Sequence, residues 1–227
     1  AFRLADRVLL PAALAPARVR RYGAAPGKTT SFPGLKEEIY LGDFTFDPGA
    51  LHRAGVAPDA ATRLVVTRPP PDGASYHRFA NPLYDAALRV LARQESVCCL
   101  ALARHPAQRA ALARLGLPNL LLPGPAQDAR SLMYAADLVL GGGGTMTREA
   151  ALLGIPTYTA FAGRACAVDD SLIAAGLLRR LRDPEELGRV GPRPHPPVAL
   201  DERRTRGRAI VEALVAATLD ASRPRAG

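Results

Sequence analysis

The stretch DLVLGGGGTMTREAALLGIP, residues 137–156, decides the fold. A short apolar segment leads into four successive glycines, 141–144, and a helix-like segment follows that ends at Gly154. Glycine loses more conformational freedom on folding than any other residue, so four together indicate a backbone that must do something a side chain would prevent. Backbone N–H groups at a helix N-terminus attract an anion, and glycines let phosphate oxygens approach them. The stretch therefore predicts a strand, an anion-binding turn and a helix.

The same order of strand and helix recurs on both sides of this stretch. The expected strands, which are apolar nearly throughout, are 63–68, 96–104, 119–123, 137–141 and 155–161. The expected helices are the second part of 76–94, then 106–116, 126–136, 145–154 and 169–176. Strands that are apolar on both faces are typical of a parallel sheet covered by helices on both sides. The sequence therefore predicts the α/β class, with a doubly wound, Rossmann-like parallel sheet.

Length and composition limit the classes of function. The chain has 227 residues, of which 48% are hydrophobic, so it can bury a sizeable core. No apolar run reaches the length of a membrane span. The chain opens on Ala1 in what resembles the middle of a fold, and we expect that the N-terminal part of a longer protein is absent.

The net charge of +9 is carried almost entirely by arginine, since only Lys28 and Lys36 among the 30 basic residues are lysines. The arginines are spread along the chain and only 5% of the residues are aromatic, so stacking platforms for nucleic acid are not evident. We therefore expect no nucleic-acid partner. The charge fits a phosphorylated small ligand and also a peripheral contact with an acidic membrane surface.

Cysteine and histidine lack a pattern that would hold a metal. Cys98 and Cys99 are adjacent in an expected strand, where neighbouring side chains point to opposite faces, and the four histidines are scattered. Three cysteines without regular spacing argue against a disulfide framework and favour a reducing compartment. We expect no metal site and a cytoplasmic location.

The segment YGAAPGKTT, residues 22–30, is similar to a phosphate loop but lacks its spacing. The pattern needs four residues between its first glycine and the Gly-Lys pair, whereas three separate Gly23 from Gly27. Pro33 follows too soon for a helix to begin. We interpret the segment as a link between domains and expect no ATP hydrolysis there.

The glycine turn differs from the dinucleotide-binding fingerprint G-x-G-x-x-G, because Met146 stands where the third glycine would be. Glu149, expected in the first turn of the helix, can stabilise the helix dipole or accept hydrogen bonds from ribose hydroxyls. A tight turn with a dipole-pairing glutamate is the alternative that the residues leave open. The candidate phosphate-binding residues are Gly142, Gly143, Gly144 and Thr145, the last as N-cap or hydroxyl donor.

Two arginines stand at the ends of other expected strands. Ligands of open α/β sheets bind at the carboxyl ends of strands, so we expect Arg68, Arg104 and the glycine turn to meet on one rim. Two guanidiniums and a helix N-terminus suit a diphosphate. Taken singly, each arginine is equally a solvent-exposed strand end. Lys36 and Glu37, within SFPGLKEEIYL, are further candidates that would line a cleft.

The segments PGLKEEIYL, VVTRPP…Y, ALARHPAQR and ADLVLGGGGTMTREAALLGIPTYTAF together resemble an uncharacterised family named domain of unknown function 354, related to the GT-B superfamily. That superfamily includes UDP-GlcNAc 2-epimerases and the GlcNAc transferase of peptidoglycan synthesis. The resemblance covers roughly residues 1–176, and GGGGTMTREAALLG is its most specific part. It implies two Rossmann-like domains facing each other across a cleft, and this chain resembles the C-terminal domain, which binds the nucleotide sugar.

Position by position, the resemblance implies that Glu149 holds the ribose hydroxyls, that 142–145 meet the diphosphate, and that Arg68 and Arg104 line the cleft. The resulting hypothesis is the UDP-sugar-binding half of a glycosyltransferase, with an unknown acceptor and no tightly bound cofactor or metal. A nucleotide-sugar 2-epimerase and a non-enzymatic module that binds an anion or nucleic acid stay open as alternatives. The acceptor site and the usual catalytic base of GT-B enzymes belong to the N-terminal domain. We therefore name no catalytic residue and expect this chain alone to be inactive.

The expected domain organisation follows from this resemblance. Residues 1–27 are the remnant and link of an N-terminal domain, 28–192 the nucleotide-sugar-binding domain, and 193–200 a Pro-rich link. Residues 201–227 are a last helix with a tail, and the resemblance implies that this helix crosses back to the missing domain. The apolar stripe of the helix consists of Ile210, Val211, Leu214 and Val215.

Overall fold

The structure is a computed structural model, which describes residues 2–57, 59, 61–70, 82–124, 127–163 and 166–222. Tyr76, the first part of the expected helix 76–94 and the tail beyond Ser222 lie outside the described residues. The chain divides into two compact units, one made of Ala1–Phe44 with Ala199–Gly227 and the other of Thr45–Val198. The expected domain boundaries, after residues 27 and 192, differ from these.

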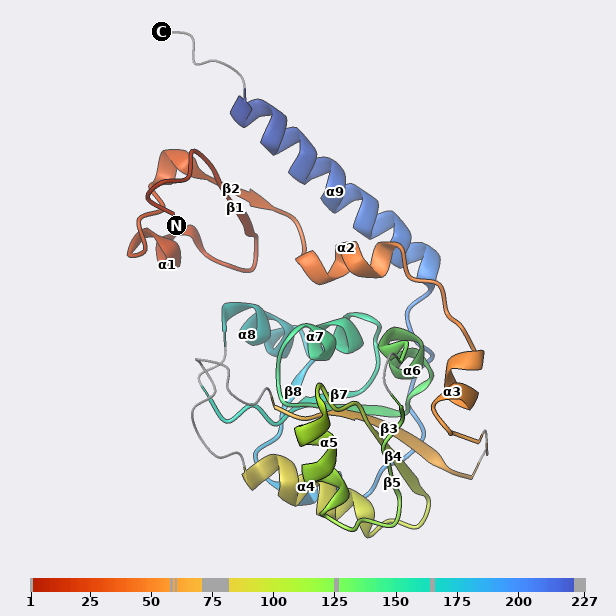
Figure 1. Cartoon of the computed structure of the whole chain (residues 1–227). Coiled ribbons are helices and arrows are strands. Elements are labelled where there is room, and N and C mark those ends of the chain that lie inside the picture. The colour runs from red at the N-terminus through yellow and green to blue at the C-terminus, as the bar shows by residue number, and fades with distance from the viewer. Residues whose placement is uncertain are drawn as a thin grey trace, which may run out of the picture. The chain divides into compact units, whose positions relative to one another are not determined.

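A six-stranded parallel sheet forms the centre of the unit Thr45–Val198 (Figure 1). Its strands are β3 (Arg63–Arg68), β4 (Val97–Ala101), β5 (Leu120–Leu121), β6 (Leu138–Gly141), β7 (Thr157–Thr159) and β8 (Arg179–Arg180). They lie in the order β5-β4-β3-β6-β7-β8, and every neighbouring pair is parallel. The chain therefore winds outward from the middle in one direction and then in the other, which confirms the predicted α/β class and doubly wound sheet.

Helices cover both faces of this sheet (Figure 1). On one face lie α4 (Pro82–Ala92) and α5 (Pro106–Ala113), and on the other lie α6 (Ala129–Ala135), α7 (Thr145–Leu152) and α8 (Ala167–Ala174). A short helix, α3 (Gly49–Arg53), precedes the sheet, and a 3-10 turn, η2 (Pro184–Leu187), packs against α4. Covering both faces removes the apolar strands from water, which is the main stabilisation of such a sheet.

Two buried hydrogen bonds at the Thr67 hydroxyl lie among apolar side chains in the middle of the sheet. Thr67 on β3 is fully buried, and its hydroxyl donates to the Leu140 carbonyl at 2.9 Å. Tyr84 on α4 therefore acts as the donor in its 2.7 Å hydrogen bond with the Thr67 hydroxyl. Burial raises the pKa of the Tyr84 hydroxyl above its usual range. The contact fixes α4 against β3 and β6.

The sequence did not predict β8, which consists of Arg179 and Arg180. Two arginines at the edge of a sheet carry no apolar signal, although the residues on either side of them, Leu178 and Leu181, are buried. In the register of β8 with β7, Tyr158 pairs with Arg179 and Thr159 with Arg180.

The unit made of Ala1–Phe44 with Ala199–Gly227 holds a two-stranded parallel sheet and a pair of packed helices. Its elements are β1 (Val8–Pro11), α1 (Pro16–Arg20), the 3-10 turn η1 (Pro26–Lys28), β2 (Thr29–Phe32), α2 (Lys36–Gly42) and α9 (Leu200–Ser222). Residues 22–30 do not have the strand, loop and helix of a phosphate loop. Lys28 leads into β2, and its Nζ donates to the Ala5 carbonyl at 3.0 Å.

Helices α2 and α9 touch backbone to backbone. A Cβ on Gly207 would lie 2.8 Å from the Cα of Gly42, so this crossing requires glycine. Glu38 on α2 accepts hydrogen bonds from the Leu35 N–H at 2.7 Å and from Arg206 Nε on α9 at 3.1 Å. One of the two carboxylates in SFPGLKEEIYL is therefore committed to holding these helices together.

Only part of the apolar stripe on α9 is buried. Ile210 is fully buried, whereas Val211 and Val215 are 41% and 50% exposed. The buried face of α9 is centred on Gly207 and Ile210, and the helical repeat of 3.6 residues turns Val211 and Val215 away from that centre. The sequence pattern identified the stripe but not which residues contact another helix.

Candidate functional site

The order of the strands reverses between β3 and β6, which lie side by side in the sheet. Ligands of open α/β sheets bind in the crevice at the carboxyl ends of strands at such a switch point. Arg68, the last residue of β3, pairs in register with Gly141, the last residue of β6. The switch point therefore lies between an arginine and the first of the four glycines.

The first two glycines of the turn are fixed by packing. A Cβ on Gly141 would overlap Thr147 of the following helix, and a Cβ on Gly142 would overlap the backbone of Pro70. The Gly142 N–H also donates to the Arg68 carbonyl at 2.9 Å. The segment after β3 and the turn after β6 are thus in direct backbone contact.

The last two glycines are required by the backbone. Gly143 and Gly144 have φ values of 92° and 95°, and the ψ of Gly144 is −171°, a combination essentially restricted to glycine. A Cβ on Gly144 would have no described atom within 4 Å, so open space faces this residue. Gly144 is the N-cap of α7 and supplies no side-chain acceptor to the first-turn N–H groups, an arrangement that suits an external anion.

Two details of the predicted turn are wrong. Thr145 is the first residue of α7 rather than its N-cap, because Gly144 takes the non-helical dihedral angles that the N-cap needs. Glu149 is the fifth residue of α7, and the first turn of the helix contains no acidic residue. The interaction of a carboxylate with a helix dipole is confined to the first turn, so the alternative reading of Glu149 as a dipole-pairing residue loses its basis.

Arg68 is half-buried at the carboxyl end of β3, and its electrostatic neighbours are the other charged candidates. Its Nη1 donates to the sulfur of Met146 on α7 at 3.7 Å, and its buried Nε has no hydrogen-bond partner in the described part of the chain. Burial lowers the pKa of the Arg68 guanidinium, the positive charge of Arg104 lowers it further, and the Glu149 carboxylate raises it. The negative charge of Glu149 therefore does not fully offset the effects of burial and of Arg104 on the Arg68 guanidinium.

Arg104 is exposed beyond the end of β4, and Gln108 on α5 ties its backbone to the segment that follows β3. The Gln108 Oε1 accepts from the Arg104 N–H at 2.8 Å, and the Gln108 Nε2 donates to the Pro70 carbonyl at 2.9 Å. Neither Pro70 nor the bridging role of Gln108 was predicted, because both depend on which strands become neighbours.

The structure brings most of the predicted site residues together at the carboxyl edge of the sheet. Arg104 and Glu149 each lie within electrostatic range of Arg68, and the turn 142–145 adjoins Arg68 through the pairing of β3 with β6. Lys36 and Glu37 belong to α2 in the other unit, where Lys36 is exposed and Glu37 is 1% exposed. Their place in a cleft stays a prediction.

This arrangement can bind an anion and a group that donates hydrogen bonds. Two guanidiniums and the N-terminus of a helix attract negative charge, and a carboxylate beside them accepts from hydroxyls. In the described ranges, no group of three or more His, Cys, Asp or Glu side chains is placed to hold a metal ion. Among the described helices, none is long and apolar enough to cross a lipid bilayer.

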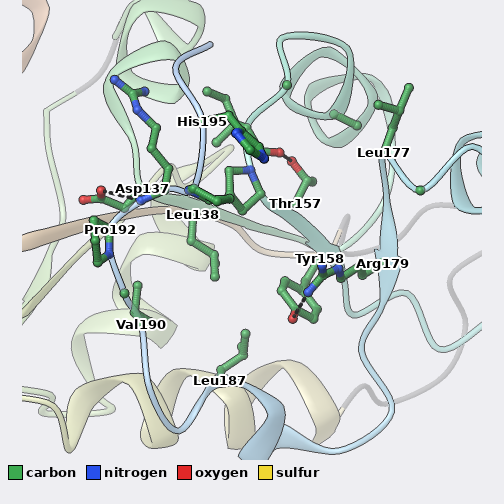
Figure 2. Close-up of a pocket in the computed structure, with 18 of the residues that line it drawn as sticks. Asp137, Leu138, Thr157, Tyr158, Leu177, Arg179, Leu187, Val190, Pro192 and His195 are labelled. Atoms are coloured by element: carbon green, nitrogen blue, oxygen red, sulfur yellow. Dashed lines mark hydrogen bonds between the residues drawn. The ribbon is translucent and has the colours of Figure 1, made fainter.

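A cavity of about 560 Å³ lies at the opposite, amino-terminal edge of the sheet (Figure 2). Leu138 and Thr157, the first residues of β6 and β7, line it together with Leu187, Val190 and Pro192. The cavity also adjoins the C-terminal end of α7, where the helix dipole disfavours an anion. It is therefore distinct from the rim that carries the glycine turn, although Arg179, Arg189 and Arg193 also line it.

Comparisons with known proteins bear on the family and the fold of the chain. The chain is 28% identical over 189 residues to an uncharacterized protein of Methanocaldococcus jannaschii, an alignment that covers 81% of this chain and 53% of that protein. The chain thus spans about half the length of the curated relative it matches.

Two solved structures show the same fold at low identity. A UDP-GlcNAc 2-epimerase of Methanocaldococcus jannaschii, in complex with UDP-GlcNAc and UDP, is similar with a TM-score of 0.61 and 13% identity over 93% of this chain and 61% of that one. The glycotransferase of kitacinnamycin is similar with a TM-score of 0.52 and 19% identity over 92% of this chain and 51% of that one. The predicted fold, a Rossmann-like sheet of the GT-B type, is confirmed.

A family model matches residues 1–193, which is most of the chain and includes the strands, the glycine turn and both strand-end arginines. The predicted resemblance is therefore confirmed, and the chain belongs to the family described as protein of unknown function (DUF354).

Proposed function

We propose that this chain is the nucleotide-sugar-binding half of a GT-B-like glycosyltransferase, with a UDP-sugar as donor substrate. The observation that carries the proposal is the meeting of Arg68, Arg104 and Glu149 with the glycine turn at the switch point. The guanidiniums and the N-terminus of α7 would bind the diphosphate, and the Glu149 carboxylate would accept from the ribose hydroxyls. The presence of UDP-GlcNAc and UDP in a structure of the same fold supports the choice of nucleotide.

In the proposed reaction, an acceptor nucleophile forms a bond to the anomeric carbon of the sugar and gives its proton to a general base. The bond between that carbon and the diphosphate oxygen breaks, and the diphosphate leaves with its bonding electrons. The negative charge that develops on the leaving oxygen would be stabilised by the fixed N–H groups of the turn and by the two arginines. We assign the acceptor site and the general base to an N-terminal domain outside this chain. The donor half would need no bound metal, because guanidiniums supply the positive charge.

A nucleotide-sugar 2-epimerase is the second candidate. The observation that favours it is that a UDP-GlcNAc 2-epimerase in complex with UDP-GlcNAc and UDP is among the solved structures that share the fold. The two activities differ in whether they require an acceptor. Full-length protein incubated with UDP-GlcNAc alone forms UDP-ManNAc if it is an epimerase, whereas a transferase releases UDP only when an acceptor is supplied.

Isothermal titration calorimetry with UDP and UDP-GlcNAc tests the binding site itself. We expect wild type to bind UDP and Glu149→Ala to bind it more weakly by about 1.5–3 kcal/mol, the range for hydrogen bonds to a charged group. Glu95→Ala removes an exposed glutamate at the amino-terminal side of β4 and serves as the matched control. Equal binding by wild type and Glu149→Ala would remove the ribose assignment.

A steep salt dependence of binding to DNA, without any effect of UDP, would favour a non-enzymatic anion-binding module.

A further inference from the structure

Gln108 connects the segments that follow two neighbouring strands. It is 4% exposed, accepts from the Arg104 N–H at 2.8 Å and donates to the Pro70 carbonyl at 2.9 Å. A glutamine side chain carries an acceptor oxygen and a donor nitrogen on one rigid amide. It can therefore bridge a backbone N–H after β4 and a backbone carbonyl after β3, and its length fixes the separation of these two groups.

Pro70, which Gln108 holds, is also the residue against which the glycine turn rests. The backbone of Gly142 lies so close to Pro70 that a Cβ would overlap it. The Gly142 N–H is held by the Arg68 carbonyl at 2.9 Å, two residues before Pro70. A displacement of Pro70 must therefore be followed by Gly142 and, through the turn, by the N-terminus of α7.

We propose that Gln108 is a positioning residue for the anion-binding turn, an inference that rests on the proposed function. Its burial keeps it from touching a bound diphosphate. It acts by setting the position of Pro70, which sets the position of Gly142, and by holding the backbone of Arg104 at the same edge. One buried amide thus couples the positions of both arginine-bearing segments to the turn.

Gln94 supplies a matched control in the same unit. Its Nε2 donates to the Leu187 carbonyl at 2.7 Å and its Oε1 accepts from the Val190 N–H at 2.8 Å, so it too bridges two backbone segments. Gln94 precedes β4 and therefore lies at the amino-terminal edge of the sheet, away from the glycine turn. Substituting either glutamine by methionine keeps the volume and removes both hydrogen bonds.

Hydrogen exchange of the free protein tests the inference without any ligand. We expect Gln108→Met to accelerate exchange of the Gly142 amide, which donates to the Arg68 carbonyl, by about ten-fold relative to wild type, on the scale of one lost hydrogen bond. Gln94→Met should accelerate exchange around Leu187 and Val190 and leave the Gly142 amide unchanged. Equal exchange of the Gly142 amide in both variants, or no change in Gln108→Met, would overturn the proposal.

The pH dependence of UDP affinity in Gln108→Glu gives a readout that a general loss of stability would not produce. Above the pKa of the introduced carboxyl, it accepts from the Arg104 N–H but has no proton for the Pro70 carbonyl. Below that pKa it is protonated and can make both hydrogen bonds, as glutamine does. We therefore expect the affinity of Gln108→Glu, divided by that of wild type at the same pH, to rise several-fold between pH 8 and pH 5. A ratio that does not change with pH would overturn the proposal.

Absence of UDP binding by wild type would contradict the proposed function, and the exchange measurement would still decide the role of Gln108.

Discussion

Arg68 and Gly141 face each other as register partners at the carboxyl ends of β3 and β6. Each is the last residue of its strand, and the two strands belong to the two oppositely wound halves of the sheet. A half-buried guanidinium with an unpartnered Nε among the described residues therefore stands beside a backbone turn that exposes N–H groups. Positive potential is concentrated there before any ligand arrives.

Replacing Arg68 by methionine should separate stability from binding. A partly buried guanidinium next to Arg104 is unfavourable in the free protein, so Arg68→Met should leave the free energy of unfolding unchanged or raise it by up to about 1 kcal/mol. The same change should weaken UDP binding by about 2 kcal/mol, because a charged hydrogen-bond donor is lost. Thermal unfolding without ligand and calorimetry with UDP measure the two effects. Arg104→Met, at an exposed position, should weaken binding with no change in stability. A large fall in the melting temperature of Arg68→Met would contradict this account.

Replacing different glycines of the turn by alanine should destabilise the protein for different reasons. Gly142→Ala introduces an overlap with Pro70, which we expect to destabilise the protein by about 1–3 kcal/mol. Gly144→Ala meets no described atom but forces a side chain into a backbone region reserved for glycine, at a cost of about 1–3 kcal/mol. Gly191→Ala has neither problem and should be neutral. Urea unfolding gives the three values. Neutral behaviour of Gly142→Ala would show that the Pro70 contact is not rigid.

Gly144 offers a further distinction within that series, since D-alanine accepts positive φ values. A semisynthetic protein with D-alanine at position 144 should recover most of the stability lost in Gly144→Ala. D-alanine at position 142 should recover less, because Gly142 does not have the positive φ that a D-residue prefers.

The buried thiol of Cys99 should make stability fall at alkaline pH. Burial, aided by the neighbouring Cys98, raises the pKa of the Cys99 thiol to about 12, whereas a cysteine in an unfolded chain titrates near ~8.5. This contribution to stability is fully present below about pH 8.5. It is lost as the pH rises toward the folded-state pKa, by up to about 1.4 kcal/mol per pH unit, because only the unfolded chain releases the proton. In urea unfolding, Cys99→Ala should show a constant difference from wild type below pH 8 and a smaller decline than wild type above pH 9. Parallel declines would contradict the prediction.

The ion pair between Arg148 on α7 and Asp169 on α8 should be worth more than surface pairs. Its atoms are 2.7 Å apart, and the two side chains are 17% and 11% exposed. Asp169→Asn should therefore cost about 3 kcal/mol, mostly because the largely buried guanidinium loses the negative charge that compensates it. A double-mutant cycle for each pair measures its coupling energy. The exposed pair of Arg93 and Glu185, at 3.3 Å, should contribute less than about 1 kcal/mol in its own cycle. Equal coupling energies for the two pairs would refute the role of burial.

Local signals in the sequence were sufficient for β3 to β7 and for the turn that follows β6, but not for β1, β2 or β8. The bounds of β3 were predicted residue for residue, from the apolar run 64–66 and the arginines that stand at both ends of the strand. The approach of Arg68, Arg104 and the glycine turn followed from a general rule about the carboxyl ends of parallel strands. Those predictions needed only the order of strands and helices.

Contacts between distant segments could not be predicted in the same way. Nothing in the sequence near Gln108 indicates that Pro70 lies within its reach, because that depends on β3 and β4 becoming neighbours. The assignment of Thr145 as N-cap failed because a glycine with unusual dihedral angles took that position. Sequence reasoning thus named the candidate ligand-binding groups and missed the residues that hold them in place.

The contact between Gly42 and Gly207 has a consequence for how the protein is made. These glycines are 165 residues apart along the chain, so at roughly 5–20 residues per second a ribosome delivers the second about 8–33 s after the first. During that interval α2 lacks α9, while the continuous segment Thr45–Val198 is synthesised before α9 and can begin to fold. Vectorial synthesis therefore favours the sheet as the first part to form, with α2 waiting for α9 as the last step.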